Sequence, residues 1–253
     1  MPVSALPSSL DWREKGVVTP VKDQGQCGGC WSFSSAETSE SMVAIATGKL
    51  MVFSEQQILS CSTNPLQCGG TGGCSGATQE IAFNYSAQAG LTLEKDYPYR
   101  AQTGRCDATK IKPAAHIKGY VYLPPNNYSA LMNAVVSAGP IAVSGAAEPW
   151  QSYESGVFES SCGTDVDHAI VLVGYGTEGT KDYWLIRNSW SAGWGENGYI
   201  RLARYGDSSK GEPCGTDSTP GDGDGCKGGP PTEQVCGICG IMSDSSYAVG
   251  ASL

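Results

Sequence analysis

Cys27 and Cys30 lie three residues apart in the stretch QGQCGGCWSF, residues 24–33, and this spacing is compatible with three kinds of chemistry. The two cysteines could be a redox-active pair or half of a zinc site. Alternatively, one of them could be a nucleophile beside a structural cysteine. A nucleophilic cysteine attacks as the thiolate, so it needs a base or a helix N-terminus that lowers its pKa.

The zinc alternative would join this pair to Cys236 and Cys239, a second Cys-X-X-Cys motif near the other end of the chain. The chain contains eleven cysteines, so disulfides in an oxidising compartment compete for these residues. The redox alternative lacks the strand that should precede the pair. We therefore expect no metal, and a zinc-stabilised binding module is the weaker alternative.

Cys30 opens a segment rich in serine and alanine that runs to Thr47 and is followed by Gly48. This pattern predicts a helix over 30–47 that ends at the glycine. Cys30 would then lie at the positive end of the helix dipole, which stabilises a thiolate.

Only two histidines are available as the base. His168 follows Asp167 and opens an apolar strand, which can hold the imidazole ring in place. His116 has no carboxylate nearby in sequence, and a lone histidine on a strand is usually structural. We therefore favour His168.

Several motifs now carry a resemblance: residues 24–33, Asp167-His168-Ala169, and Asn188-Ser-Trp190 followed by Gly193-Trp194-Gly195. In this order, and with DWR at residues 11–13, they resemble the papain-like cysteine proteases of the cathepsin L-like branch. The interval from Cys30 to His168 lies within the roughly 130–150 residues typical of that family. The resemblance implies a two-lobe α+β fold with the active-site cleft between the lobes, and no cofactor.

The same resemblance implies roles for five residues. Cys30 would be the nucleophile, and His168 would take its proton and later protonate the leaving amine. Asn188 would hold the imidazole ring, and Trp190 would shield the contact between the two from water. Gln24 would donate its side-chain amide to the oxyanion of the tetrahedral intermediate.

The family pattern also implies three disulfides and leaves Cys30 free, which accounts for the odd number of cysteines. The implied pairs are Cys27–Cys74, Cys61–Cys106 and Cys162–Cys239. Four cysteines remain, Cys68, Cys214, Cys226 and Cys236, and three connectivities stay open. Our working hypothesis is Cys214–Cys226 with Cys68–Cys236.

Substrate binding is implied on both walls of the cleft. Asp244 would form the floor of the pocket that receives the P2 side chain, with Ser144 on its wall. A partly buried carboxylate is costly unless paired, so a basic P2 residue should be accepted beside apolar ones. The implied lining of the rest of the cleft is Gly76, Ala77 and Thr78 on one side and Asp167, Ala169 and Trp190 on the other.

Helix and strand patterns in the sequence predict which secondary-structure elements position these residues. Helices are expected over 30–47, after Ser54, and over 77–89, and short strands over 169–175, 183–187, 199–203 and 247–249. The chain is thus expected to be one catalytic domain, residues 1–253. It would have a mainly helical lobe over about 15–118 and a mainly antiparallel, barrel-like β lobe over about 119–253.

Residues 205–235 are rich in glycine and aspartate and show no periodicity, which predicts a loop insertion on the surface. Asp222-Gly-Asp-Gly could suggest calcium, but the later glutamate of a calcium loop is missing. We expect the insertion to lie away from the cleft. Because the sequence also lacks the adjacent histidine pair of cathepsin B-like exopeptidases, it favours an endopeptidase over an exopeptidase. A catalytically silent relative that only binds proteins is the other alternative, and the intact catalytic set argues against it.

Composition excludes other function classes. The formal net charge is −9, and no run of lysine or arginine forms a nucleic-acid stripe. No apolar run approaches the roughly 20 residues of a membrane span, and the first residues lack a secretory signal pattern. We expect a monomer in a lysosome-like or vacuole-like acidic compartment, or a secreted protein. Its partners would be protein or peptide substrates, and a propeptide or protein inhibitor in the cleft.

Overall fold

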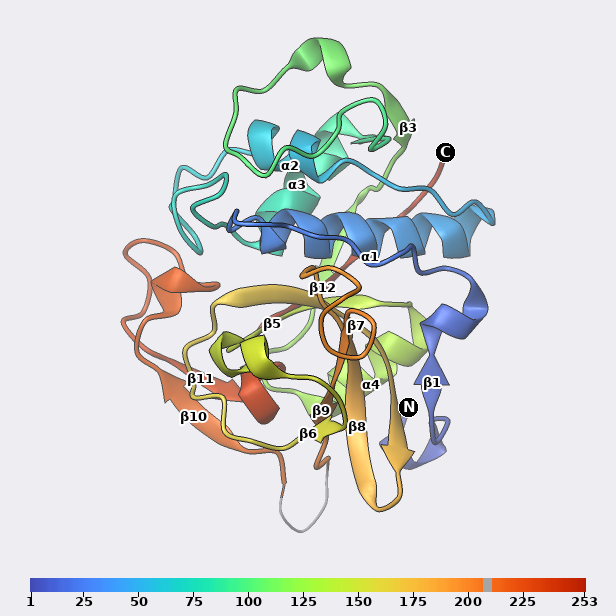
Figure 1. Ribbon diagram of the computed structural model, residues 1–253, viewed down its shortest axis with the longest axis vertical. Helices are drawn as coiled ribbons and strands as arrows, with labels where there is room; N and C mark the ends of the chain where they lie inside the picture. The colour runs from blue at the N-terminus through green and yellow to red at the C-terminus, as the bar shows by residue number, and fades with distance from the viewer. Residues whose placement is uncertain (207–210) are drawn as a thin grey trace.

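Three of the four α-helices and the main sheet occupy separate lobes of the computed structural model, which describes residues 1–206 and 211–253. Part of the predicted insertion, residues 207–210, therefore lies outside the described residues. The helical lobe lies above the sheet in Figure 1, and the long helix α1 forms the floor of that lobe. Helix α1 packs against strand β7 of the sheet, so the two lobes meet along this contact.

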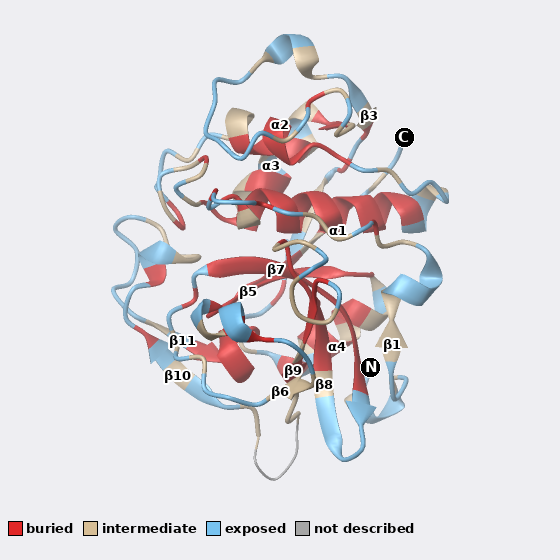
Figure 2. Cartoon of the chain, viewed as in Figure 1, coloured by how far each residue is buried: buried red, intermediate tan, exposed pale blue. Residues whose placement is uncertain are grey.

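The helical lobe contains α1 (Cys30–Thr47), α2 (Glu55–Cys61), α3 (Gln79–Ala89) and the short strands β2 (Leu91–Thr92) and β3 (Pro113–Ala115). Helix α1 has the bounds predicted from sequence, and Gly48 ends it with a left-handed φ of +73°. Every residue from Trp31 to Ala44 is buried, as the red helix in Figure 2 shows. Its small serine and alanine side chains let neighbouring elements approach it from all sides.

Helix α2 begins after Ser54, whose hydroxyl accepts a hydrogen bond from the Gln57 backbone N–H at 2.9 Å. The Gln57 side chain does not return to Ser54. It donates instead to the carbonyl of Gly90, at 3.0 Å, and so ties α2 to the end of α3. Only half of a capping box is therefore formed.

The β lobe is built on an eight-stranded sheet in the order β4-β12-β5-β7-β8-β9-β6, with β1 paired to β7. Its strands are β1 (Leu10–Asp11), β4 (Gly119–Tyr122), β5 (Ile141–Gly145), β6 (Val157–Phe158), β7 (His168–Glu178), β8 (Lys181–Arg187), β9 (Tyr199–Ala203) and β12 (Ser245–Val249). Helix α4 (Tyr128–Ser137) packs on this sheet. One pair, β6 with β9, is parallel, so the sheet is not wholly antiparallel as predicted.

The two ends of the chain cross between the lobes. Strand β1 joins β7 in the β lobe, whereas Ser252 pairs with His116 on the helical side. The backbone N–H of His116 donates to the Ser252 carbonyl at 2.8 Å, and the reverse bond is 2.9 Å. The two ends of the chain therefore connect the lobes to each other.

The insertion is more ordered than the sequence predicted. Strands β10 (Cys214–Asp217) and β11 (Glu233–Cys236) form a separate antiparallel pair, and a 3₁₀ turn lies at Pro220–Asp222. This segment is the orange-red loop at the left of Figure 1, reaching from the sheet toward the helical lobe. None of the described helices has the length and apolarity that a membrane crossing requires.

Candidate active site

Cys30 and His168 come from different lobes and meet where α1 begins and β7 begins. Cys30 is the free cysteine of the chain, and its thiol is hydrogen-bonded to His168. Burial alone would raise the pKa of the Cys30 thiol. The hydrogen bond and charge of His168 outweigh that effect, together with hydrogen bonds from the backbone of Ala169 and Trp31, so the pKa is lowered. This geometry favours a thiolate.

The imidazole ring of His168 is held from two sides. Its Nε2 lies 2.8 Å from Oδ1 of Asn188, which also accepts from the Ser189 backbone N–H at 2.8 Å. The Trp190 ring stacks on the imidazole with a centroid separation of 4.9 Å. Asn188 is fully buried, so its contact with His168 is shielded from water.

Gln24 is held beside the loop that carries Cys30. Its side-chain carbonyl accepts from the Ser189 hydroxyl at 2.6 Å, and its Nε2 donates to the Cys27 carbonyl at 3.0 Å. A side-chain amide has two N–H groups, and among the described residues only this one acceptor is bound. The second N–H has no hydrogen-bond partner among the described residues.

A cleft pocket of about 250 Å³ surrounds the thiol. One wall comprises Gly28, Cys30 and residues 69–70 and 74–77, and the opposite wall comprises Asp167 and Ala169. Gly76 and Ala77 therefore line the cleft as expected from the resemblance. Thr78 is buried at the start of α3 and is not part of the lining, and Trp190 covers His168 instead.

One lining residue was missed by the sequence analysis: Asp222, from the 3₁₀ turn of the insertion. The expectation that the insertion lies away from the cleft was therefore wrong. The reason is a long-range disulfide, Cys68–Cys226, which ties the insertion to the helical lobe. The only sequence feature that pointed to Asp222 was the acidic, glycine-rich composition around it. That composition does not indicate where the segment lies relative to the cleft.

Asp244 is buried beside the cleft rather than turned out to solvent, and only 1% of it is exposed. Its Oδ2 accepts from Nε2 of Gln79 at 2.6 Å and from the hydroxyl of Ser144 at 2.7 Å. Burial raises the pKa of the Asp244 carboxyl well above its usual value, and the nearby charges of Glu80 and Asp224 raise it further. Neither Asp244 nor Ser144 lines the cleft pocket itself.

Five disulfides account for the other ten cysteines. The structure contains the pairs Cys27–Cys74, Cys61–Cys106, Cys162–Cys239, Cys68–Cys226 and Cys214–Cys236. The hypothesis of Cys214–Cys226 with Cys68–Cys236 was therefore wrong, because the paired strands β10 and β11 place Cys214 opposite Cys236. The zinc alternative also fails, since three of its four sulfurs lie in disulfides.

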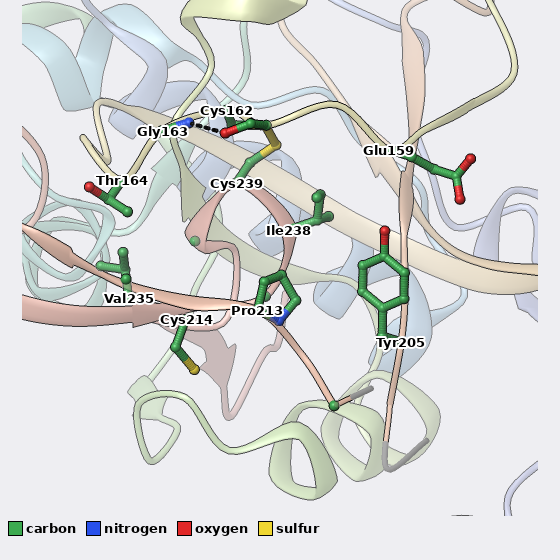
Figure 3. A pocket seen from close by; sticks show the side chains of 15 residues that line it. Glu159, Cys162, Gly163, Thr164, Tyr205, Pro213, Cys214, Val235, Ile238 and Cys239 are labelled. Atoms are coloured by element: carbon green, nitrogen blue, oxygen red, sulfur yellow. Dashed lines mark hydrogen bonds between the residues drawn. A yellow bond between two sulfur atoms is a disulfide. The ribbon is translucent and has the colours of Figure 1, made fainter. Parts of the chain in front are cut away.

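Two other features stay outside the catalytic arrangement. His116 is exposed and lies in the bridge to Ser252. A hollow of about 520 Å³ lies between residues 159–164 and the strands β10 and β11, with Tyr205 and Ile238 in its wall (Figure 3). Neither Cys30 nor His168 lines it. Within 1–206 and 211–253, no group of three or more histidine, cysteine or acidic side chains is arranged to hold a metal ion.

Comparison with known proteins finds one family throughout. The model of the family described as papain family cysteine protease matches residues 6–221. The oryzain beta chain of Oryza sativa subsp. japonica is 44% identical over 205 residues, which are 80% of this chain and 43% of that protein. The KDEL-tailed cysteine endopeptidase CEP2 of Arabidopsis thaliana is 41% identical over 238 residues, 88% of this chain and 64% of that protein.

A solved structure gives the same result. The bromelain protease from Ananas comosus in complex with the E64 inhibitor has a TM-score of 0.78 and 39% identity. The match covers 96% of this chain and 99% of that chain. This agreement confirms the two-lobe α+β fold that the motifs predicted. The chain spans about half the length of the curated relatives it matches.

Proposed function

This chain belongs to the papain family of cysteine proteases, and from that premise we propose that it hydrolyses peptide bonds as a cysteine endopeptidase. The proposal treats residues 1–253 as one catalytic domain. The single observation that carries it is the free thiol of Cys30, hydrogen-bonded to a histidine whose other ring nitrogen is held by buried Asn188. That arrangement is what thiolate catalysis requires, and it argues against a catalytically silent relative.

In the proposed reaction the Cys30 sulfur attacks the carbonyl carbon of the scissile bond as the thiolate. The oxyanion that forms is bound by the free N–H of the Gln24 side chain and by the backbone N–H of Cys30. His168, protonated in the ion pair, gives its proton to the leaving amine, and the C–N bond breaks to leave a thioester. His168 then takes a proton from water, whose oxygen attacks the thioester, and the acid product and the thiol are released.

Active-site titration with an epoxide thiol inhibitor tests this function. We expect one mole of label per mole of protein, located on Cys30 by peptide mapping, and turnover of fluorogenic peptides that Cys30→Ala abolishes. Labelling without turnover would instead support a silent binding protein. Failure to label Cys30 would contradict the proposed nucleophile.

The specificity proposal is that a basic P2 residue is accepted beside leucine and phenylalanine. It is supported by the carboxyl of Asp244, whose hydrogen-bond partners among the described residues are only the neutral donors Gln79 and Ser144. A cationic P2 group beside this carboxyl would favour its ionised form. We expect Asp244→Ala to lower kcat/KM for a P2 arginine peptide more than for a P2 leucine peptide. An unchanged ratio between the two substrates would contradict this role.

The proposed location is a vacuole-like acidic compartment or the secreted space. Five disulfides support an oxidising route, and one relative is by name KDEL-tailed. The proposed partners of the cleft are peptide substrates and a propeptide or protein inhibitor. Similar structures include a complex with the E64 inhibitor and a stem bromelain precursor, which support inhibitor and propeptide binding. The protein would act as a monomer.

A further inference from the structure

Residues 216–227 of the insertion, which we name the strap, are fastened to the helical lobe at three points. The Cys68–Cys226 disulfide is the covalent one. The backbone N–H of Gly69 donates to the carbonyl of Gly225 at 2.9 Å, and that of Lys227 donates to the carbonyl of Leu66 at 3.0 Å. This end of the strap therefore follows the loop that precedes Cys74.

The other end of the strap is fastened to the β lobe, just before His168. The carboxylate of Asp217, itself fully buried, accepts from the backbone N–H of Val166 at 3.2 Å. The hydroxyl of Thr219 donates to Asp165 at 2.8 Å. The strap thus joins the two lobes, and both attachments lie within a few residues of the cleft lining.

Glycines in the strap permit an approach that other residues would block. A Cβ on Gly223 would overlap the carbonyl oxygen of Val166, and a Cβ on Gly69 would overlap the carbonyl oxygen of Gly223. The strap backbone is therefore in van der Waals contact with both walls. A peptide leaving the pocket in this direction meets the strap.

The strap lies at the end of the cleft that takes the acyl side of a substrate. An extended peptide can pair with the backbone of Ala77, whose N–H and C=O have no hydrogen-bond partner in the described part of the chain. Gly69 packs directly against that carbonyl. A peptide bound to Ala77 with its scissile carbonyl at Cys30 therefore runs toward Gly69 and the strap.

The strap presents one carboxylate to this end. Asp222 is exposed and lines the same pocket as Cys30 and Ala77, and the only other charged group in the lining is Asp167. We propose that Asp222 binds a cationic group on the acyl side of the substrate. The group is an ammonium or guanidinium, supplied either by the free α-amino terminus of a short acyl segment or by a lysine or arginine side chain. The proposal rests on the proposed protease function and adds a specificity residue from outside the predicted site.

Four fluorogenic peptides separate the two sources of charge. They share leucine at P2 and glutamine at P1, carry lysine or norleucine at P3, and have a free or acetylated amino terminus. We expect a cationic group to raise kcat/KM roughly fivefold, the size of a solvent-exposed ion pair, and the gain to shrink at high salt. A gain with free termini alone identifies the α-ammonium, and a gain with acetylated lysine identifies the side chain.

Asp222→Asn should remove the gain, measured as the ratio of kcat/KM between each cationic peptide and the acetylated norleucine peptide within the same variant. Glu154→Gln, an equal charge change at an exposed residue outside the pocket, should keep it. Equal gains in wild type and Asp222→Asn would overturn the proposal, as would the absence of any gain in wild type. If the acetylated norleucine peptide is not cleaved and Cys30 is not labelled, the proposed protease function itself fails.

A second variant tests the strap independently of its charge. Cys68→Ser with Cys226→Ser removes the covalent link to the helical lobe. We expect the gain from cationic groups to fall and kcat/KM for peptides with a long neutral acyl side to rise relative to short ones. An unchanged ratio between long and short peptides would overturn the inference that the strap limits this end of the cleft.

Discussion

The protein contains two groups of buried or half-buried carboxylates, and they differ in what balances their charge. In the helical-lobe cluster, Lys22 forms ion pairs with Glu40 and Glu55, and Arg187 pairs with Glu37 at 3.0 Å. In the strap-side cluster, Glu80, Asp224, Glu233 and Asp244 take part in none of the ion pairs that the described residues form.

Cations dominate the first cluster. Burial alone would lower the pKa of Lys22, but the charges of Glu40 and Glu55 raise it, so its ammonium group stays charged. Burial raises the pKa of Glu37 to about 7, against the opposing charges of Arg187 and Lys22. Buried ions arranged in this way hold their partners in place, and removal of one partner leaves an uncompensated charge.

In the strap-side cluster no cation in the described part of the chain balances the carboxylates, so bound protons must neutralise them. Burial raises the pKa of Asp244, Glu80 and Asp224, and of Glu233 to about 8. The folded protein therefore binds more protons than the unfolded chain once the pH exceeds about 4. Its stability from this cluster is present at acidic pH and is lost as the pH rises toward about 8. The two clusters therefore differ in whether a buried cation accompanies the carboxylates and not in the direction of the pKa shift, since burial also raises the pKa of Glu37 and of Glu55.

The largest expected effect comes from breaking the paired cluster. Lys22→Met leaves Glu40 and Glu55 buried without their cation and should lower the free energy of unfolding by about 3–5 kcal/mol at neutral pH. Urea denaturation of protein whose Cys30 is blocked by the epoxide inhibitor measures this without autolysis. Adding Glu55→Gln to the variant should restore part of the loss. A loss below about 1 kcal/mol would show that the ion pairs are not what holds this cluster.

Neutralising a carboxylate of the strap-side cluster should stabilise the protein, in contrast to the loss expected for Lys22→Met. Asp244→Asn keeps an oxygen acceptor for Gln79 and Ser144 but removes a buried group that resists ionisation. It should raise the free energy of unfolding by about 1–3 kcal/mol near pH 8 and leave it unchanged near pH 4. Denaturation midpoints at the two pH values check this difference. Destabilisation at the higher pH would mean that the Asp244 carboxylate is compensated after all.

Glu233→Gln should also raise the free energy of unfolding near pH 8, by less than Asp244→Asn does. Its pKa is raised to about 8 by burial and by the neighbouring Asp224, but the residue is only half-buried, so solvent screens its charge in part. A gain below about 1 kcal/mol near pH 8 is therefore expected. Thermal unfolding across the pH range should show a flatter pH dependence than in wild type. A curve that is steeper than wild type would contradict this role of Glu233.

The smallest effect should come from a surface pair that resembles neither cluster. Glu178 pairs with Arg201 at 2.8 Å but is 57% exposed, and Arg201 keeps Glu196 as a second partner. Glu178→Gln should change the free energy of unfolding by less than about 0.5 kcal/mol at any pH. The same urea assay checks it, and a change above about 1 kcal/mol would show that exposure is a poor guide to these pairs.

The local features of the active site could be predicted from sequence because they depend on near neighbours. The helix from Cys30 follows from its small residues and from the stop at Gly48, and β7 follows from the apolar run after His168. Asn188 and Gln24 were identified by their place in motifs. The helix Tyr128–Ser137 was missed although Asn127 caps it by accepting from the Ala130 backbone N–H, and the strand Ile141–Gly145 was missed as well.

The sequence by itself determined which residues could act as nucleophile, base and orienting amide, and that the fold has two lobes. The tertiary structure alone decided that Cys68 pairs with Cys226, that Asp222 lines the cleft, and that Asp244 is buried with Glu80 and Asp224 nearby. The physical reason is the sequence separation between the residues that interact. Helix and strand signals are set by residues a few positions apart. In contrast, a segment without periodicity takes its position from contacts with distant parts of the chain, which its composition does not specify.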